Sequence, residues 1–278
     1  MASEEIYNGT NVEKVNAHQV WDLGFRGKDI IVAVIDSGVN TEHEDLKDHL
    51  WDDGNGNHGY NTLDSNNDLS DGSGHGTHCA GTVCGDGTSG TITGMAPDAT
   101  LMVVKVLDEN GAGTIASVIA GVQYAIKNGA NVMSLSIGFS YAKTYEREAF
   151  REVFANALEA GVVAAVAAGN DGDDLDDYPV PYNVNAPGNC PPPYLSQDQQ
   201  SNIGALTSVI SVGAVNYNDE PCEFSSEGPV TWQDSKFADY PLGSAYSTEN
   251  IGYDNGEYSH SLSNAEASKF AVMFPSSM

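Results

Sequence analysis

Five short, mostly apolar runs constrain the fold of this chain more than any other feature. They cover residues 30–35, 101–106, 132–137, 162–168 and 209–215. Runs of this length and composition are typical of parallel strands that are buried on both faces. The sequence therefore predicts a mainly parallel sheet.

Helical periodicity fills two of the gaps between these runs. After Thr114, which can cap a helix, apolar residues recur every three or four positions until Asn128 and Gly129. Residues 150–158 repeat the pattern before Gly161. Strands that alternate with helices form right-handed crossovers, and the helices cover both faces of the sheet. We predict an α/β fold of three layers, organised as a single domain over residues 1–278.

The chain is strongly acidic. It has 11 Lys and Arg against 39 Asp and Glu, a formal net charge of -28. Such a chain repels phosphate backbones and anionic lipid surfaces, so we expect neither a nucleic-acid nor a membrane partner. Two interpretations of the acidity stay open: a heavily hydrated surface, and calcium sites among the Asp clusters.

The polar segment 51–71 carries most of the calcium hypothesis. It contains the sequence DDGNG at residues 52–56 and NND at residues 66–68. The spacing is similar to a calcium loop but lacks the glutamate at the twelfth position of an EF-hand. The segment is thus either a solvated, turn-rich loop or a structural calcium site.

The cysteines and the N-terminus say little about the compartment. Cys79, Cys84, Cys190 and Cys222 form no CxxC pair, so neither a zinc site nor a redox motif is indicated. No run is long enough for a membrane span, and residues 1–6 lack the pattern of a signal peptide. We expect a cytoplasmic protein if the sequence is complete, and a secreted one if it is an excised mature domain. In either case we expect a monomer.

Polar residues with catalytic potential follow several of the apolar runs. Asp36 ends the first run, residues 136–138 end the third and Asn170 follows the fourth. In open parallel sheets, sites form beyond the carboxyl ends of the strands. His75 enters a predicted helix through a glycine-rich approach, and its imidazole can act as a base near neutral pH. A carboxylate, an imidazole and a carboxamide match the needs of acyl transfer by a serine.

Several ordered motifs resemble those of the subtilisin-like serine proteases. Residues 34–38 (VIDSG) are similar to the aspartate motif of that family, and residues 74–81 (GHGTHCAG) to its histidine motif. Residues 94–97 (GMAP), 134–138 (SLSIG), 167–170 (AAGN) and 224–229 (FSSEGP) resemble further family segments, in the family order. The resemblance implies a serine endopeptidase that acts on polypeptides, and a structural calcium ion.

The resemblance also implies roles for individual residues. Asp36 orients the imidazole, His75 is the general base and then the general acid, and the side chain of Asn170 stabilises the oxyanion. His78, three residues after His75, is expected to be a packed, hydrogen-bonded histidine rather than a metal ligand. No metal-binding residue is assigned.

An extended substrate is expected to pair with the backbone of several short segments, as in strand addition. The substrate-binding residues implied by the resemblance are Gly111, Ala112, Gly113, Ser134, Leu135, Ser136, Gly138, Ala168 and Gly169.

The serine motif of the family is missing. The atypical tail, residues 231–278, is polar and rich in tyrosine, and it lacks an intact Gly-Thr-Ser-Met-Ala-x-Pro block. Residues 275–278 (PSSM) carry the nearest match, which makes Ser277 the candidate nucleophile, although Pro275 stands where the family has glycine. Three explanations stay open: a truncated or frame-shifted enzyme, a silent relative that binds peptides, and an enzyme completed by another segment.

Overall fold

The structure is a computed structural model that describes residues 10–90, 93–140, 142, 144–180, 182–190, 208–216, 218–228 and 253–254. The chain forms two compact units, which meet in the sequence between Leu135 and Ser136. Cys79, Cys84, Cys190 and Cys222 are all buried and form no disulfide.

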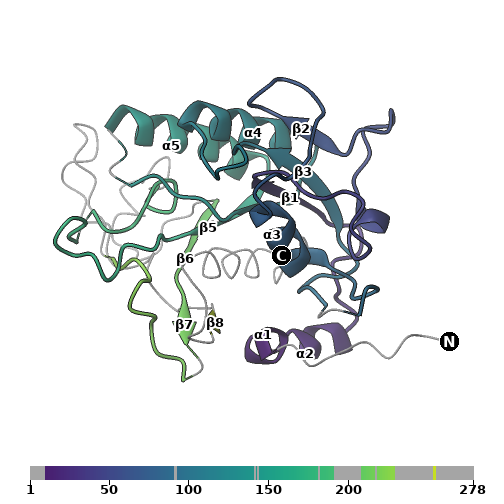
Figure 1. Cartoon of the computed structure of the whole chain (residues 1–278), viewed down its shortest axis with the longest axis horizontal. Coiled ribbons are helices and arrows are strands. Elements are labelled where there is room, and N and C mark those ends of the chain that lie inside the picture. Colours follow the sequence, from purple (N-terminus) through teal and green to yellow (C-terminus); the bar gives the residue numbers. More distant parts are fainter. Residues whose placement is uncertain are drawn as a thin grey trace. The chain divides into compact units, whose positions relative to one another are not determined.

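Four parallel strands form the centre of the first unit. Their order is β2 (Gly59–Asn61), β3 (Thr100–Lys105), β1 (Ile31–Asp36) and β4 (Val132–Leu135). Figure 1 shows β1 and β3 side by side. β1 lies between two other strands, and five of its six residues are buried. This position explains why its sequence is apolar up to Asp36.

Helices α3 (His75–Cys84) and α4 (Ile115–Lys127) cover opposite faces of this sheet. A Cβ added to Gly76 of α3 would lie 3.1 Å from the Cβ of Asp36, and one added to Gly121 of α4 would lie 3.4 Å from Cγ2 of Ile35. Ile35 and Asp36 are consecutive in β1, and consecutive strand residues point to opposite faces. The sheet therefore lies between two helical layers.

The start of α4 has the cap that its sequence predicts. The amide of Ser117 donates to Oγ1 of Thr114, and the amide of Thr114 donates to Oγ of Ser117, which forms a capping box. The helix ends at Lys127, before Asn128 and Gly129.

Three shorter helical elements complete the first unit: α1 (Thr10–Lys14), α2 (Ala17–Asp22) and the 3-10 helix η1 (Lys47–His49). The indole Nε1 of Trp21, on α2, donates to the carbonyl oxygen of Met95 at 2.9 Å. Val12, Ala17, Trp21 and Met95 form a small apolar cluster of their own. Hence α1 and α2 are fastened to the segment that precedes β3.

The second unit contains a parallel pair, β5 (Val163–Ala167) and β6 (Val209–Val212), and the helix α5 (Thr144–Glu159). Phe150, Phe154 and Ala157 of α5 are buried, and Oγ of Ser208 donates to the carbonyl oxygen of Phe154. A second, two-stranded sheet pairs β7 (Val215–Asn216) with β8 (Tyr253–Asp254).

The predicted fold class, α/β with a mainly parallel sheet between helices, is confirmed. The run 209–215 is not one strand but two, because Ala214 leaves the sheet and exchanges hydrogen bonds with the amide of Cys222 and Oγ of Ser225. Sequence reasoning missed β2, which is short and not apolar. Among the described residues, no helix combines the length and the apolarity that crossing a membrane requires.

Candidate active site

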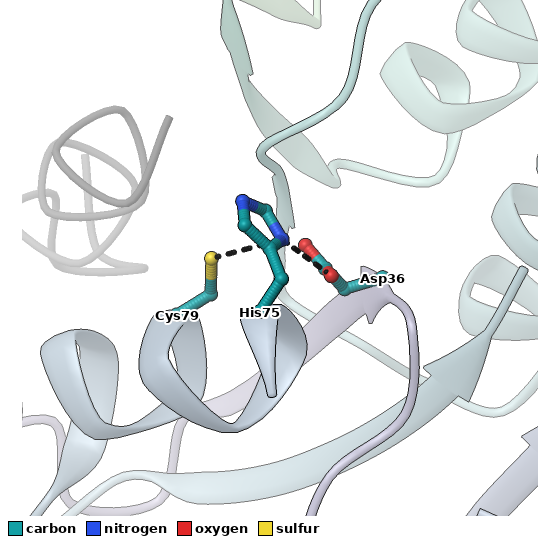
Figure 2. A group of neighbouring side chains, drawn as sticks. All are labelled: Asp36, His75 and Cys79. Atoms are coloured by element: carbon teal, nitrogen blue, oxygen red, sulfur yellow. Dashed lines mark hydrogen bonds and ion pairs between the residues drawn. The ribbon is translucent and has the colours of Figure 1, made fainter. Parts of the chain in front are cut away.

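Asp36 and His75 lie against each other in the first unit. Nδ1 of His75 donates to Oδ1 of Asp36 at 2.7 Å, and the second ring nitrogen points away from the carboxylate (Figure 2). Asp36 is almost completely buried, with 1% of its surface exposed, whereas 19% of the His75 side chain is exposed. The pair thus has a buried acid and an imidazole with one nitrogen left for a reaction.

Backbone geometry explains how β1 and α3 approach so closely. Gly76 follows His75 in the first turn of α3, and a Cβ at this position would lie 2.1 Å from the carbonyl oxygen of Gly38. Only glycine tolerates such a contact. Gly76 is therefore a packing requirement that brings α3, and with it the imidazole of His75, to the end of β1.

The surroundings of His75 act on its pKa in opposite directions. Burial of the imidazole lowers the pKa, while the hydrogen bond to Asp36 and the neighbouring Cys79 raise it, and the net shift is upward. Oδ1 of Asp36 also accepts from the amide of Ser37 at 2.7 Å, which fixes the orientation of the carboxylate. The hydrogen bond to Asp36 therefore stabilises the positive charge that the imidazole acquires when its second nitrogen accepts a proton.

Cys79 lies one helical turn after His75, with Sγ at 3.8 Å from Nδ1 (Figure 2). In the part of the chain that the structure describes, Asp36, His75 and Cys79 form the one group of three His, Cys, Asp or Glu side chains that could share a metal ion. A single carboxylate oxygen with a nitrogen and a sulfur does not suit calcium, which takes six to eight oxygen ligands. Residues four positions apart in a helix are neighbours, so the spacing of His75 and Cys79 is consistent with this proximity, although a cysteine at such a position is also an ordinary core residue.

The predicted substrate-binding residues of the first unit occupy two places. Gly111, Ala112 and Gly113 form a turn after β3, where the amide of Ala112 donates to Oδ1 of Asp108. Gly111 and Ala112 are exposed, while Ser134 and Leu135 are buried at the end of β4. The turn is therefore accessible to a substrate, whereas the side chains of Ser134 and Leu135 are not.

The predicted residues of the second unit gather around a residue that sequence reasoning missed, Asn185. Its amide donates to the carbonyl oxygen of Ala168 at 2.8 Å. A Cβ added to Gly138 would lie 2.9 Å from the Cβ of Asn185, and one added to Gly169 would lie 2.5 Å from its Nδ2. Gly138, Ala168 and Gly169 thus meet at Asn185, although the sequence around Asn185 carries no signal of its own.

Ser136, two residues before Gly138, is buried. Asn170 follows Gly169 after β5, where it is partly buried. Gly169 has a φ of 122°, and its carbonyl oxygen accepts from the amide of Ser226 at 3.1 Å. Oγ of Ser226 accepts from the amide of Asp171, also at 3.1 Å. The backbone on both sides of Asn170 is therefore fixed by Ser226, which lies in the segment 224–229.

Of two other expectations, the one for His78 has an outcome, and the one for Ser277 is not tested. His78 was expected to be packed, which is wrong: it is exposed, since the buried side of α3 is formed by Gly76, Cys79, Ala80, Val83 and Cys84. Ser277 lies outside the described residues, as does the tail 231–278 except for Tyr253 and Asp254.

Comparison with known proteins gives consistent results. The sequence profile described as "Subtilase family" matches residues 27–264. The major intracellular serine protease of Bacillus subtilis (strain 168) is 34% identical over 234 residues, which cover 81% of this chain and 63% of that protein. Subtilisin E of the same strain is 34% identical over 218 residues, covering 78% of this chain and 49% of that protein.

A solved structure is also similar. The crystal structure of a cold adapted subtilisin-like serine proteinase aligns with a TM-score of 0.55 and 28% identity, covering 74% of this chain and 62% of the other. The chain spans between about half and just under two thirds of the length of these relatives.

Proposed function

Because this chain belongs to the subtilase family, we propose that it is a serine endopeptidase that hydrolyses peptide bonds of polypeptide substrates. The observation that carries the proposal is the hydrogen bond between Asp36 and Nδ1 of His75. It joins the two motifs that, in the family order, precede the nucleophile.

In the proposed mechanism, Asp36 keeps the proton of the imidazole on Nδ1, so that Nε2 is the basic nitrogen. A serine hydroxyl attacks the carbonyl carbon of the substrate and transfers its proton to Nε2 of His75. The imidazolium then gives this proton to the leaving amine as the peptide C–N bond breaks. Water repeats the sequence on the acyl ester and releases the second product. Ser277 is the proposed nucleophile on sequence grounds.

Asn170 is the proposed oxyanion donor. Its carboxamide would donate to the oxygen that becomes negatively charged in the tetrahedral intermediate. The fixed backbone around it supports this role, because a donor must be in place before the charge develops.

The substrate backbone is proposed to pair with residues 111–113 and 134–136, and to pass Gly138, Ala168 and Gly169. The exposed turn at Gly111 and Ala112 supports the first contact, since its main chain is open to a partner. In strand addition of this kind, the hydrogen bonds are made to the main chain of the substrate.

Calcium stays a prediction for this chain, as does the monomeric state. The oxygen atoms predicted to bind calcium lie in the loop 51–71. Two of them already accept hydrogen bonds from backbone amides of the same loop: Oδ1 of Asp52 from Gly54 and Gly56, and Oδ1 of Asp53 from Asn55 and Asn57. Thermal unfolding in calcium chloride and in EDTA tests the ion: a site raises the melting temperature in calcium, and equal values argue against one.

A fluorophosphonate probe tests the proposed function. We expect the wild-type protein to be labelled on one serine, identified by mass spectrometry of the digested protein as Ser277, and the His75→Ala variant to remain unlabelled. Absence of labelling in a folded wild-type sample contradicts the proposal. If such a sample binds peptides without labelling, it is a silent peptide-binding relative.

A further inference from the structure

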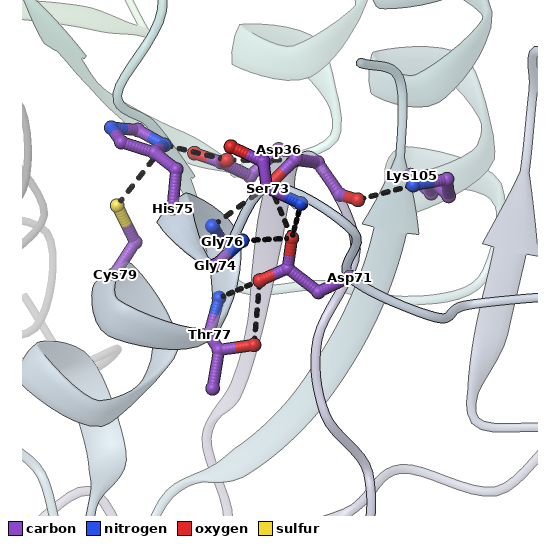
Figure 3. A network of polar contacts seen from close by, with 10 residues as sticks. Asp36, Asp71, Ser73, Gly74, His75, Gly76, Thr77, Cys79 and Lys105 are labelled. Carbon is purple, nitrogen blue, oxygen red and sulfur yellow. Dashed lines mark hydrogen bonds and ion pairs between the residues drawn. The ribbon is translucent and has the colours of Figure 1, made fainter. Parts of the chain in front are cut away.

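The Asp36–His75 pair joins two separate elements, β1 and α3, and a second carboxylate connects the same elements beside it. Asp71 lies in the loop before α3 and accepts hydrogen bonds from both sides (Figure 3). Its Oδ1 accepts from Oγ of Ser37 at 2.9 Å, and its Oδ2 accepts from the amide of Thr77 at 2.8 Å and from Oγ1 of Thr77 at 2.6 Å. Ser37 directly follows Asp36, and Thr77 is two residues after His75.

The hydrogen bonds of Asp71 to Ser37 and Thr77 form a bridge between the end of β1 and α3. The hydroxyl of Ser37 makes a further bond across it. Its Oγ donates to Asp71 and accepts from the amide of Gly76 at 2.9 Å. The amide of Ser37 donates to Oδ1 of Asp36, the same oxygen that accepts from His75. A continuous series of bonds therefore runs from the catalytic carboxylate through Ser37 to the first turn of α3.

Asp71 also takes the place of a helix cap. The residue before α3 is Gly74, which has no side chain to satisfy the free amides of the first turn. Asp71 accepts from the amides of Gly74 and Thr77, and a negative charge is favoured at the N-terminus of a helix. Burial raises the pKa of Asp71, but the hydrogen bonds from Thr77, Gly74 and Ser37 outweigh it, so the pKa is lowered and the carboxylate stays charged.

Lys105 holds the backbone on the other side of the bridge. Its Nζ donates to the carbonyl oxygens of Ser37 and Ser70, the residues that follow Asp36 and precede Asp71. Only 8% of Lys105 is exposed, and it lies at the end of β3, in register with Asp36. The backbone just after Asp36 and the backbone just before Asp71 are thus bound by the same cation.

We propose that Asp71 is a positioning residue, which sets the distance between Asp36 and His75 by binding Ser37 and Thr77 at the same time. Its effect on catalysis rests on the proposed protease function. Its effect on the imidazole does not, because the pKa of His75 can be measured without turnover.

The test measures the pKa of His75 by an NMR titration of the full chain, with three variants. Asp71→Asn replaces one acceptor oxygen by an amide nitrogen, so one side of the bridge is lost. Thr77→Val removes a donor but keeps the charge of Asp71, which separates positioning from a simple loss of negative charge. Thr77→Ser retains the hydroxyl. Asp68→Asn is the control for loss of charge. Within the part of the chain that the structure describes, this exposed carboxylate accepts hydrogen bonds from Ser70 and none from β1 or α3.

We expect Asp71→Asn and Thr77→Val to lower the pKa of His75 by about one unit, because the bond to Asp36 loosens. Thr77→Ser and Asp68→Asn keep the wild-type value. On a peptide substrate, kcat falls about 10- to 100-fold in the first two variants at unchanged KM, as misplaced reacting groups require.

The proposal is overturned if folded Thr77→Val retains the wild-type pKa of His75, or if Asp68→Asn lowers it as much as Asp71→Asn does. Should Asp71→Asn fail to fold, Thr77→Val alone decides the question. If the wild type cleaves no substrate, the protease proposal fails, while the titration still decides the role of Asp71.

Discussion

At the end of β1, a hydrogen bond joins two side chains directly. After β5, by contrast, hydrogen bonds fix the backbone on both sides of Asn170, and this backbone sets the position of its side chain. Asp36 and His75 share a hydrogen bond of 2.7 Å, and Ser37, Asp71 and Thr77 support it with further side-chain bonds. Around Asn170, the main chain of Gly169 and Asp171 bonds to Ser226.

The difference follows from the chemistry predicted for each region. A general base needs a particular protonation state, which a neighbouring charge determines. An oxyanion donor needs only a fixed position, which a constrained backbone provides. Substitutions that change charge at constant shape should therefore have the largest effect on the first region. Substitutions that add a side chain to a glycine should have the largest effect on the second.

The largest expected effect is on catalysis in the first region. Asp36→Asn preserves the shape of the side chain but removes the charge, and we expect kcat to fall roughly 10⁴-fold, with His75→Ala at least as severe. Peptide hydrolysis at substrate saturation measures this. Asp98→Asn, a change in the surface ion pair with Arg26, is the control and should leave kcat unchanged. A similar kcat for Asp36→Asn and wild type would contradict the role of the pair.

The corresponding substitution in the second region should have a smaller effect. Asn170→Ala removes one oxyanion donor, for which we expect a loss of about 100- to 1000-fold in kcat with little change in KM. Asn218→Ala, an exposed residue in a turn of the same unit, is the matched control. A loss confined to KM would show instead that Asn170 binds the substrate in its ground state.

The effect of adding a side chain to a glycine of the second region can be measured as a change in the free energy of unfolding. Gly169 has a positive φ, and an added Cβ would lie 2.5 Å from Nδ2 of Asn185 and 2.6 Å from Oγ of Ser226. We expect Gly169→Ala to lower the free energy of unfolding by about 3 kcal/mol, from both strain and overpacking. Urea denaturation gives the value.

Gly161→Ala is the control for this experiment. Gly161 also has a positive φ, of 74°, but nothing lies within 4 Å of an added Cβ. Its substitution should cost only about 1 kcal/mol, the penalty of the backbone conformation alone. Equal costs at the two positions would show that the contacts of Gly169 with Asn185 and Ser226 add nothing.

The two regions also differ in how much the sequence reveals. Asp36 was predictable because an apolar run ends in a carboxylate, and His75 because glycines precede it. The residues that hold this pair in place could not be predicted. Asp71 and Lys105 are charged residues that ordinarily lie in solvent, and only the register of β1 and β3 places Lys105 beside Ser37.

Long-range pairing is the physical reason for the remaining omissions. Asn185 and Ser226 lie 15 or more residues from Gly169 along the chain, and their contacts with it depend on how intervening loops fold. β2 was missed because three residues, one of them glycine, carry no strand signal before β3 is present to pair with them.

The central claim is that Asp36 and His75 act as one acid–base pair, and an NMR titration of the His75 imidazole in wild type and Asp36→Asn tests it most directly. Because the pKa of His75 is raised in the folded state, the pair stabilises the fold below about pH 6.5, and this contribution is lost as the pH rises through the raised value. The account predicts a wild-type pKa above that of an ordinary imidazole and a lower one in Asp36→Asn. An ordinary pKa in both proteins would contradict it.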